Sequence, residues 1–170
     1  MTVKQFALQD DLWQQISAAI EGFLPEPAAA KLLQRIADLP IRPSRATRTL
    51  GAYVSKAGLP VSIRLQFAQE PDSLRETFLH ELAHLCDHLC HQPGQRYRRA
   101  HGPHWQQWAK LLGSEAKRCG RSVALEKLYQ QRLKPVAVCQ TCGSEFRRIR
   151  RLNRRRKYFH RDCGGRLEPI

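Results

Sequence analysis

The chain has 170 residues, close to the length of one domain, which predicts one main hydrophobic core with at most a small appendage. Its 29 Lys and Arg residues outnumber 15 Asp and Glu residues and give a formal net charge of +14. Residues 131–170 hold 12 of the basic and 3 of the acidic residues, a net charge of +9, against +5 for residues 1–130. A basic tail after a more nearly balanced body predicts a polyanionic partner, most simply nucleic acid.

Composition also excludes other classes of protein. No apolar run reaches the roughly 18 residues that a membrane-spanning helix requires, so we expect no membrane partner. Residues 1–12 lack the apolar core of a signal peptide, and we expect a cytoplasmic protein that is free to associate with the nucleoid. Six cysteines in such a chain indicate metal ligands or buried thiols, not a disulfide framework.

The first part of the chain predicts two helices followed by a β-hairpin. Apolar residues at helical spacing indicate a helix over 12–23, and Pro27 suits the first position of a second helix that ends near residue 37. Alternating apolar and polar residues predict a half-buried strand over 61–67, with residues 49–54 as its hairpin partner.

Three further helices are expected after the hairpin. Ser73 and Glu76 have the spacing of a capping box, and an apolar face follows them to Leu89. Pro103 is expected to begin the next helix and Gly113 to end it. Residues 122–133 are predicted to be helical as well. We place the domain boundary after them, at Pro135, which gives domains 1–134 and 135–170.

The motif His80-Glu81-Leu82-Ala83-His84 carries the clearest chemistry of the chain. Residues four apart on a helix lie one above the other, so both imidazoles can reach one ion. Glu81 lies to the side, where its carboxylate can hold a water molecule without binding the metal. Two histidine ligands, an open position and a carboxylate base are typical of a zinc hydrolase. We therefore expect His80 and His84 as zinc ligands and Glu81 as the catalytic base.

A hydrolytic zinc site usually takes a third protein ligand. We favour His101, because a loop with Gly and Pro separates it from His84 and lets the chain turn back. His88, His91 and His104 are the alternatives. His88 would meet the ion poorly from the same straight helix, and we expect His88 and His104 to make local hydrogen bonds instead.

These residues carry a resemblance to the SprT-like family, which includes the Spartan-type proteases that digest proteins crosslinked to DNA. The resemblance implies a zinc metallopeptidase with zinc bound by His80, His84 and His101 and catalysis by Glu81. The chain is more similar to the short bacterial members, and many members carry an acidic residue where His104 stands. The matching segments are Phe78-Leu79-His80-Glu81-Leu82-Ala83-His84, Ala100-His101-Gly102-Pro103-His104-Trp105 and Leu112-Gly113.

The tail contains a second set of candidate metal ligands. Two pairs of residues follow the pattern Cys-x2-Cys-x17-His-x2-Cys, which suits a structural zinc site closed by four ligands. The ligands would be Cys139, Cys142, His160 and Cys163. Similar family members often have cysteine in place of this histidine. The alternative is that the metal is lost and these cysteines are merely buried. The other cysteines, Cys86, Cys90 and Cys119, are expected to be core thiols.

A cluster of eight basic residues lies within residues 147–157. Arginine forks suit phosphate oxygens, and the nearby Phe146, Tyr158 and Phe159 could stack on bases, which predicts DNA binding without sequence preference. The alternative is a solvated basic face without a partner. The predicted contacts are Arg147, Arg148, Arg150, Arg151, Arg154, Arg155, Arg156 and Lys157.

Together these features predict an α+β fold: a zincin-like helical domain with a small β-hairpin before the zinc helix, then a basic zinc ribbon. The predicted function is a zinc metalloprotease that binds DNA and acts on DNA-bound or DNA-crosslinked proteins. By analogy with zinc peptidases, the edge of strand 61–67 would bind an extended peptide. The alternatives are a non-enzymatic nucleic-acid-binding protein with a structural first zinc and a hydrolase that acts on something other than peptides.

Overall fold

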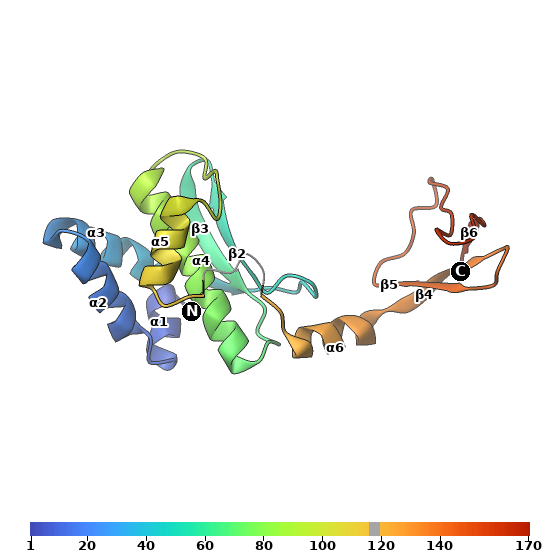
Figure 1. The fold of residues 1–170 in the computed structure, drawn as a ribbon, viewed down its shortest axis with the longest axis horizontal. Helices are drawn as coiled ribbons and strands as arrows, with labels where there is room; N and C mark the ends of the chain where they lie inside the picture. The colour runs from blue at the N-terminus through green and yellow to red at the C-terminus, as the bar shows by residue number, and fades with distance from the viewer. Residues whose placement is uncertain (116–119) are drawn as a thin grey trace. The chain divides into compact units, whose positions relative to one another are not determined.

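The computed structural model describes residues 1–115 and 120–170, which fall into two units, Met1–Ala124 and Leu125–Ile170 (Figure 1). Pro135, at which the sequence places the boundary, lies inside a strand of the second unit, where the pairing register shifts. A proline without an amide hydrogen is tolerated at such a bulge. The expected mixture of helices and small sheets is confirmed in the described residues.

Three helices open the first unit: α1 (Val3–Gln9), α2 (Trp13–Phe23) and α3 (Glu26–Ala37). The helices expected over 12–23 and 27–37 are confirmed, although Glu26 begins α3 one residue earlier than expected. Helix α1 was not predicted. Its sign in the sequence is a capping box in which the side chains of Thr2 and Gln5 each accept a hydrogen bond from the other residue's backbone N–H.

A three-stranded sheet follows, made of β1 (Ile41–Pro43), β2 (Gly51–Lys56) and β3 (Leu59–Leu65) in the order β1-β3-β2. The antiparallel pairing of β2 with β3 confirms the hairpin, while β1 pairs in parallel with β3 and was not predicted. Because β3 is paired on both sides, the proposal that its edge binds a peptide is wrong. Among the strands of the described residues, β2 packs beside α4 and pairs with β3 alone, so β2 is an edge strand.

The long helix α4 (Pro71–His91) packs against this sheet and against α5 (Pro103–Leu111). The expected capping box of α4 is wrong, because Pro71 begins the helix two residues before Ser73. The hydroxyl of Ser73 donates instead to Gln69, and Glu76 accepts from the Ser114 hydroxyl. Gly113 follows α5 with a positive φ of 84°, as expected of a residue that ends a helix.

The core of the first unit lies where α4 meets the other helices and the sheet (Figure 1). Large side chains with less than 2% exposure come from every layer and hold α4 in place. Burying one such side chain contributes about 1.5–3 kcal/mol. They include Ile16, Ile36, Ile63, Phe78, Leu82, Leu85, Trp105 and Trp108. Since α4 carries the motif from His80 to His84, this core fixes the position of that motif.

The second unit is built around a sheet of β4 (Lys134–Cys139), β5 (Glu145–Arg148) and β6 (Leu167–Pro169) in the order β5-β4-β6, all antiparallel. Helix α6 (Val123–Arg132), most of which belongs to this unit, precedes the sheet and confirms the helix expected over 122–133. A small cluster of buried residues, among them Val136, Leu152 and Leu167, forms its core. Over residues 1–115 and 120–170, no helix has the length and apolarity needed to cross a membrane.

Candidate metal centre

Three imidazole nitrogens converge at the middle of α4. The Nε2 atom of His80 lies 3.2 Å from Nε2 of His84 and 3.1 Å from Nε2 of His101. In a tetrahedral zinc site with Zn–N bonds of about 2.0–2.1 Å, two ligand nitrogens lie about 3.3 Å apart. Two of the three nitrogen pairs therefore have the spacing of tetrahedral zinc ligands, the three ligand atoms all lie within 4.8 Å of one another, and the sequence named all three residues.

His101 reaches the other two histidines from the loop that precedes α5. Its backbone is left-handed, with φ of 66°, and Arg99 has φ of 55°. Such a conformation costs an ordinary residue roughly 1–2 kcal/mol. The backbone N–H of Gly102 donates to the carbonyl oxygen of Arg99 and closes the turn. Two left-handed residues within three positions turn the chain sharply, so that the loop brings His101 back over α4.

Trp105 packs against all three histidines. Its ring centroid lies 4.5 Å from that of His101, 4.8 Å from His80 and 5.1 Å from His84. The indole is 1% exposed, and its N–H donates to the carbonyl oxygen of His80 at 3.4 Å. The sequence indicated Trp105 only as part of an apolar helix face. The structure shows that its ring also packs against all three imidazoles of the candidate site.

The tautomer of His84 is set by Tyr97 and Asp87. The hydroxyl of Tyr97 donates its one proton to Oδ2 of Asp87 at 2.8 Å and lies 2.9 Å from Nδ1 of His84. With its proton given to Asp87, this hydroxyl can only accept from His84, so Nδ1 carries the hydrogen and Nε2 keeps a free lone pair. Burial, followed by the nearby His80 and His101, lowers the pKa of His84 to about 3, which favours the neutral form.

The alternative third ligands make other contacts. His88 is fully buried, and its Nε2 lies 2.8 Å from the carbonyl oxygen of Gln95, to which it must donate. Its Nδ1 then accepts from the hydroxyl of Tyr53 at 2.6 Å, so both nitrogens are used. His91 and His104 stack on one another, with ring centroids 3.9 Å apart, and form a separate group. The hydrogen bonds expected of His88 are therefore observed, whereas His104 stacks on another histidine.

Glu81 lies on α4, next to His80, and is 7% exposed. Its Oε2 accepts a hydrogen bond from the backbone N–H of Tyr53 in β2 at 2.6 Å. Burial raises the pKa of Glu81 to about 7, and the Tyr53 hydrogen bond opposes that rise. A cation bound by the histidines would further favour the ionised carboxylate. Glu81 thus has one oxygen held by β2 and the properties of a proton acceptor near neutral pH.

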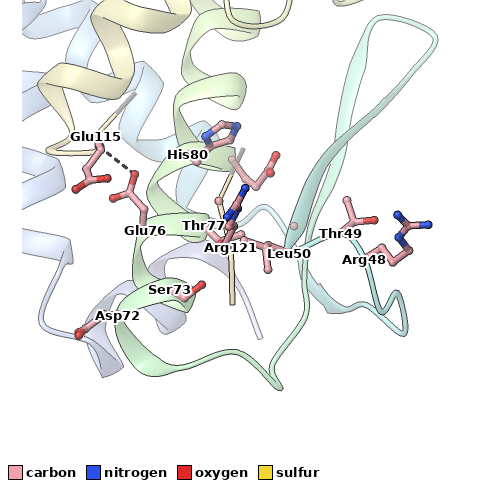
Figure 2. A pocket seen from close by; sticks show the side chains of 13 residues that line it. Arg48, Thr49, Leu50, Asp72, Ser73, Glu76, Thr77, His80, Glu115 and Arg121 are labelled. Atoms are coloured by element: carbon pink, nitrogen blue, oxygen red, sulfur yellow. Dashed lines mark hydrogen bonds between the residues drawn. The ribbon is translucent and has the colours of Figure 1, made fainter. Parts of the chain in front are cut away.

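A cleft of about 830 Å³ opens beside His80 and Glu81. Its walls come from the start of β2, from the N-terminal half of α4 and from the chain on either side of residues 116–119. Figure 2 shows Glu76 and Glu115 on one side of the opening and Arg48 on the other. The cleft that reaches His80 is thus lined by groups of both charge signs.

The second unit brings together the other predicted metal ligands, Cys139, Cys142, His160 and Cys163. The Cys163 sulfur lies 3.5 Å from that of Cys139 and 3.6 Å from that of Cys142. The Nδ1 atom of His160 lies 3.3 Å from the Cys142 sulfur and 3.2 Å from the Cys163 sulfur. Zn–S bonds of about 2.3 Å would place two sulfurs about 3.8 Å apart and a sulfur and a nitrogen about 3.6 Å apart. The donor set and spacing fit zinc.

Two of the three remaining cysteines pack into the core of the first unit, as expected. Cys86 is fully buried and Cys90 is half-buried, and burial raises the pKa of both thiols. Cys119 lies outside the described residues.

All eight basic residues of the segment 147–157 are exposed. Leu152, which is 6% exposed, anchors this segment to the small core of the second unit. Of the three aromatic residues proposed to stack on bases, Phe159 is 61% exposed, whereas Phe146 and Tyr158 pack against the core. The structure therefore presents the charges at the surface together with one of the three rings.

In the comparison with known proteins, the model of the SprT-like family matches residues 28–125. This span includes both parts of the histidine motif and ends before the cysteine cluster. No curated protein and no solved structure matches the chain.

Proposed function

Because the chain belongs to the SprT-like family, we propose that it is a zinc metallopeptidase whose ligands are His80, His84 and His101. The observation that carries the proposal is the convergence of three imidazole nitrogens beside a buried carboxylate at the wall of a cleft. A structural zinc site needs no base, so the presence of Glu81 at this place favours hydrolysis over the non-enzymatic alternative.

In the proposed reaction, bound zinc supplies Lewis acidity and lowers the pKa of a water molecule to about 7. Glu81 accepts the proton of the attacking water and later gives it to the leaving amine. The backbone N–H of Tyr53 holds one carboxylate oxygen, so the other is left to meet the water. Tyr97 and Trp105 keep the His84 ring in its ligating orientation.

Strand β2 is the proposed binding edge for the polypeptide substrate. The carbonyl oxygen of Leu50 accepts from Gln66, so Leu50 and Ala52 direct their backbone groups toward β3. The alternate residues Gly51 and Tyr53 direct theirs to the opposite side, where Glu81 meets the Tyr53 N–H. An extended peptide that adds to this edge would bind mainly through its backbone, which favours broad sequence tolerance.

The second unit is proposed to be a zinc ribbon that binds DNA. Its ligand cluster fits a structural zinc site of three cysteines and one histidine, and its basic segment 147–157 is exposed. Arginine side chains bind phosphate oxygens without reading base sequence, so DNA of any sequence would serve. Attachment to DNA would raise the local concentration of proteins bound or crosslinked to the same DNA.

The test is incubation of the purified protein with a DNA-bound protein, with and without DNA and with and without a chelator, followed by gel analysis. We expect cleavage that requires metal and increases with DNA. The matched control is Glu81→Gln, which should retain zinc and lose at least 10²-fold in rate, because an amide cannot accept the proton. Equal cleavage by both proteins would exclude Glu81 as the base. No cleavage by zinc-loaded protein of any polypeptide would favour the non-enzymatic alternative.

A further inference from the structure

Asp87 has one carboxylate oxygen that the described residues leave without a hydrogen bond. The residue lies on α4 and is 2% exposed. Its Oδ2 accepts from the hydroxyl of Tyr97, but its Oδ1 is buried and has no hydrogen-bond donor. The Nδ1 atom of His91 lies 3.2 Å from Oδ1, in ion-pair contact but without hydrogen-bond geometry. A buried carboxylate oxygen without a donor is costly unless a cation satisfies it.

A second histidine lies at the same place. His104, in the first turn of α5, stacks on His91 with an interplanar angle of 9°. The ligand atoms of Asp87, His91 and His104 all lie within 4.8 Å of one another. One carboxylate and two imidazoles form a donor set that binds zinc and similar divalent cations.

We propose that Asp87, His91 and His104 form a further divalent-metal site, distinct from both sites described above. The lone pair of an imidazole lies in the ring plane, so two stacked rings cannot both point at one ion. One ring must therefore rotate about its Cβ–Cγ bond when the ion binds. Both histidines are exposed, which permits that rotation and leaves room for water to complete the coordination.

The position of this site defines its role. Asp87 and His91 stand at the end of α4, and His104 stands at the start of α5, so an ion here joins the two ends of the loop 92–102. The same loop supplies His101 and Tyr97 to the first metal centre. An ion bound by Asp87, His91 and His104 would therefore restrain the loop that carries the third ligand.

The experiment measures zinc content and loop protection in the full-length Glu81→Gln protein, which removes self-cleavage from the readout. We expect three zinc ions per chain after equilibrium dialysis against Zn²⁺, and two in His104→Ala and in His91→Ala. The matched control is Gln107→Ala, at an exposed position of the same helix, which should keep three. Zn²⁺ added beyond two equivalents should slow trypsin cleavage after the exposed residues Arg96, Arg98 and Arg99 at least severalfold, and this additional protection should disappear in His104→Ala.

Equal zinc content in His104→Ala and in its parent would overturn the third site. This outcome is separate from the fate of the proposed function, which is tested by His101→Ala. If His101→Ala lost one ion and neither His104→Ala nor His91→Ala lost any, the catalytic zinc site would be supported and the additional site excluded.

Discussion

The hydroxyl of Tyr97 lies 2.9 Å from Nδ1 of His84 and accepts a hydrogen bond from it. Because the Tyr97 hydroxyl donates its hydrogen bond to Asp87, it can only accept from His84. The three groups thus form a hydrogen-bonded chain that runs from His84 through Tyr97 to Asp87. The chain fixes which imidazole nitrogen is free to bind a metal and supports the basicity of that nitrogen.

We predict that Tyr97→Phe lowers the affinity of the first zinc site 10- to 100-fold, the effect typical of lost partners of metal-binding histidines. The phenyl ring keeps the packing against His84 but cannot accept its Nδ1–H. Equilibrium competition with a chelator of known zinc affinity measures this change. The matched control is Tyr158→Phe, which removes a hydroxyl in the second unit, where it accepts from the Asn153 N–H. Unchanged competition in Tyr97→Phe would show that this hydroxyl does not support the site.

Gly51 is predicted to be required for the close approach of β2 to α4. A Cβ atom at this residue would lie 2.5 Å from Cγ2 of Thr77 and 3.1 Å from Cγ of Glu81. Gly51→Ala should therefore destabilise the first unit by about 1–3 kcal/mol, as overpacked substitutions do, and displace Glu81. Thermal denaturation measures the first effect and peptide hydrolysis the second.

Gly22 provides the control for that substitution. It lies in α2, and nothing stands within 4 Å of the Cβ atom that alanine would add. Gly22→Ala should leave activity unchanged and stabilise the helix by roughly 0.5–1 kcal/mol. A melting temperature for Gly51→Ala at or above that of the parent would contradict the packing argument.

His160 is predicted to be replaceable by cysteine but not by alanine. Its Nδ1 lies within 3.3 Å of two cysteine sulfurs, and a set of four cysteines forms a tetrahedral zinc site as readily as three cysteines and one histidine. Elemental analysis should give His160→Cys the same zinc content as the parent, and His160→Ala and Cys163→Ser one ion fewer. If Cys163→Ser kept its full zinc content, the ribbon would not be a zinc site.

Short-range sequence patterns predicted the parts of the site that one helix or one loop can define. The spacing of His80 and His84 places both rings on one side of α4 wherever that helix packs. His101 was predictable because the loop before it contains Pro93 and Gly94, which allow a reversal of the chain. The zinc-ligand pairs of the tail follow from local spacing in the same way.

The features that sequence reasoning missed depend on residues far apart in the chain. Strand β1 has three residues and is stabilised by parallel pairing with β3, more than twenty positions later, so no local period marks it. Tyr53 and Tyr97 reach the site only after β2 and the loop have docked on α4. The capping box failed for a local reason, because Pro71 begins α4 two residues before Ser73, and Glu76 instead accepts from Ser114 and the Glu115 N–H.

The last prediction concerns the segment 147–157 of the second unit. Eight exposed positive charges in eleven residues should neutralise several phosphates and release condensed counterions. The logarithm of the DNA-binding constant should then fall against the logarithm of salt concentration with a slope of roughly −3 to −6 on duplex DNA. Fluorescence anisotropy at several salt concentrations measures that slope.

Replacing Arg154, Arg155 and Arg156 together by glutamine should make the slope less steep by about 0.9 for each phosphate contact that is lost. The control has the same change in net charge: Lys31, Lys56 and Lys110, exposed residues of the first unit, replaced by glutamine. If affinity depended on net charge alone, both triple variants would lose the same amount. A specific surface on the second unit requires that the arginine variant lose affinity and slope while the lysine variant retains both. Equal losses of DNA affinity in the two variants would mean that the basic segment acts only through the net charge of the protein. If neither variant lost affinity, the segment would serve a partner other than DNA.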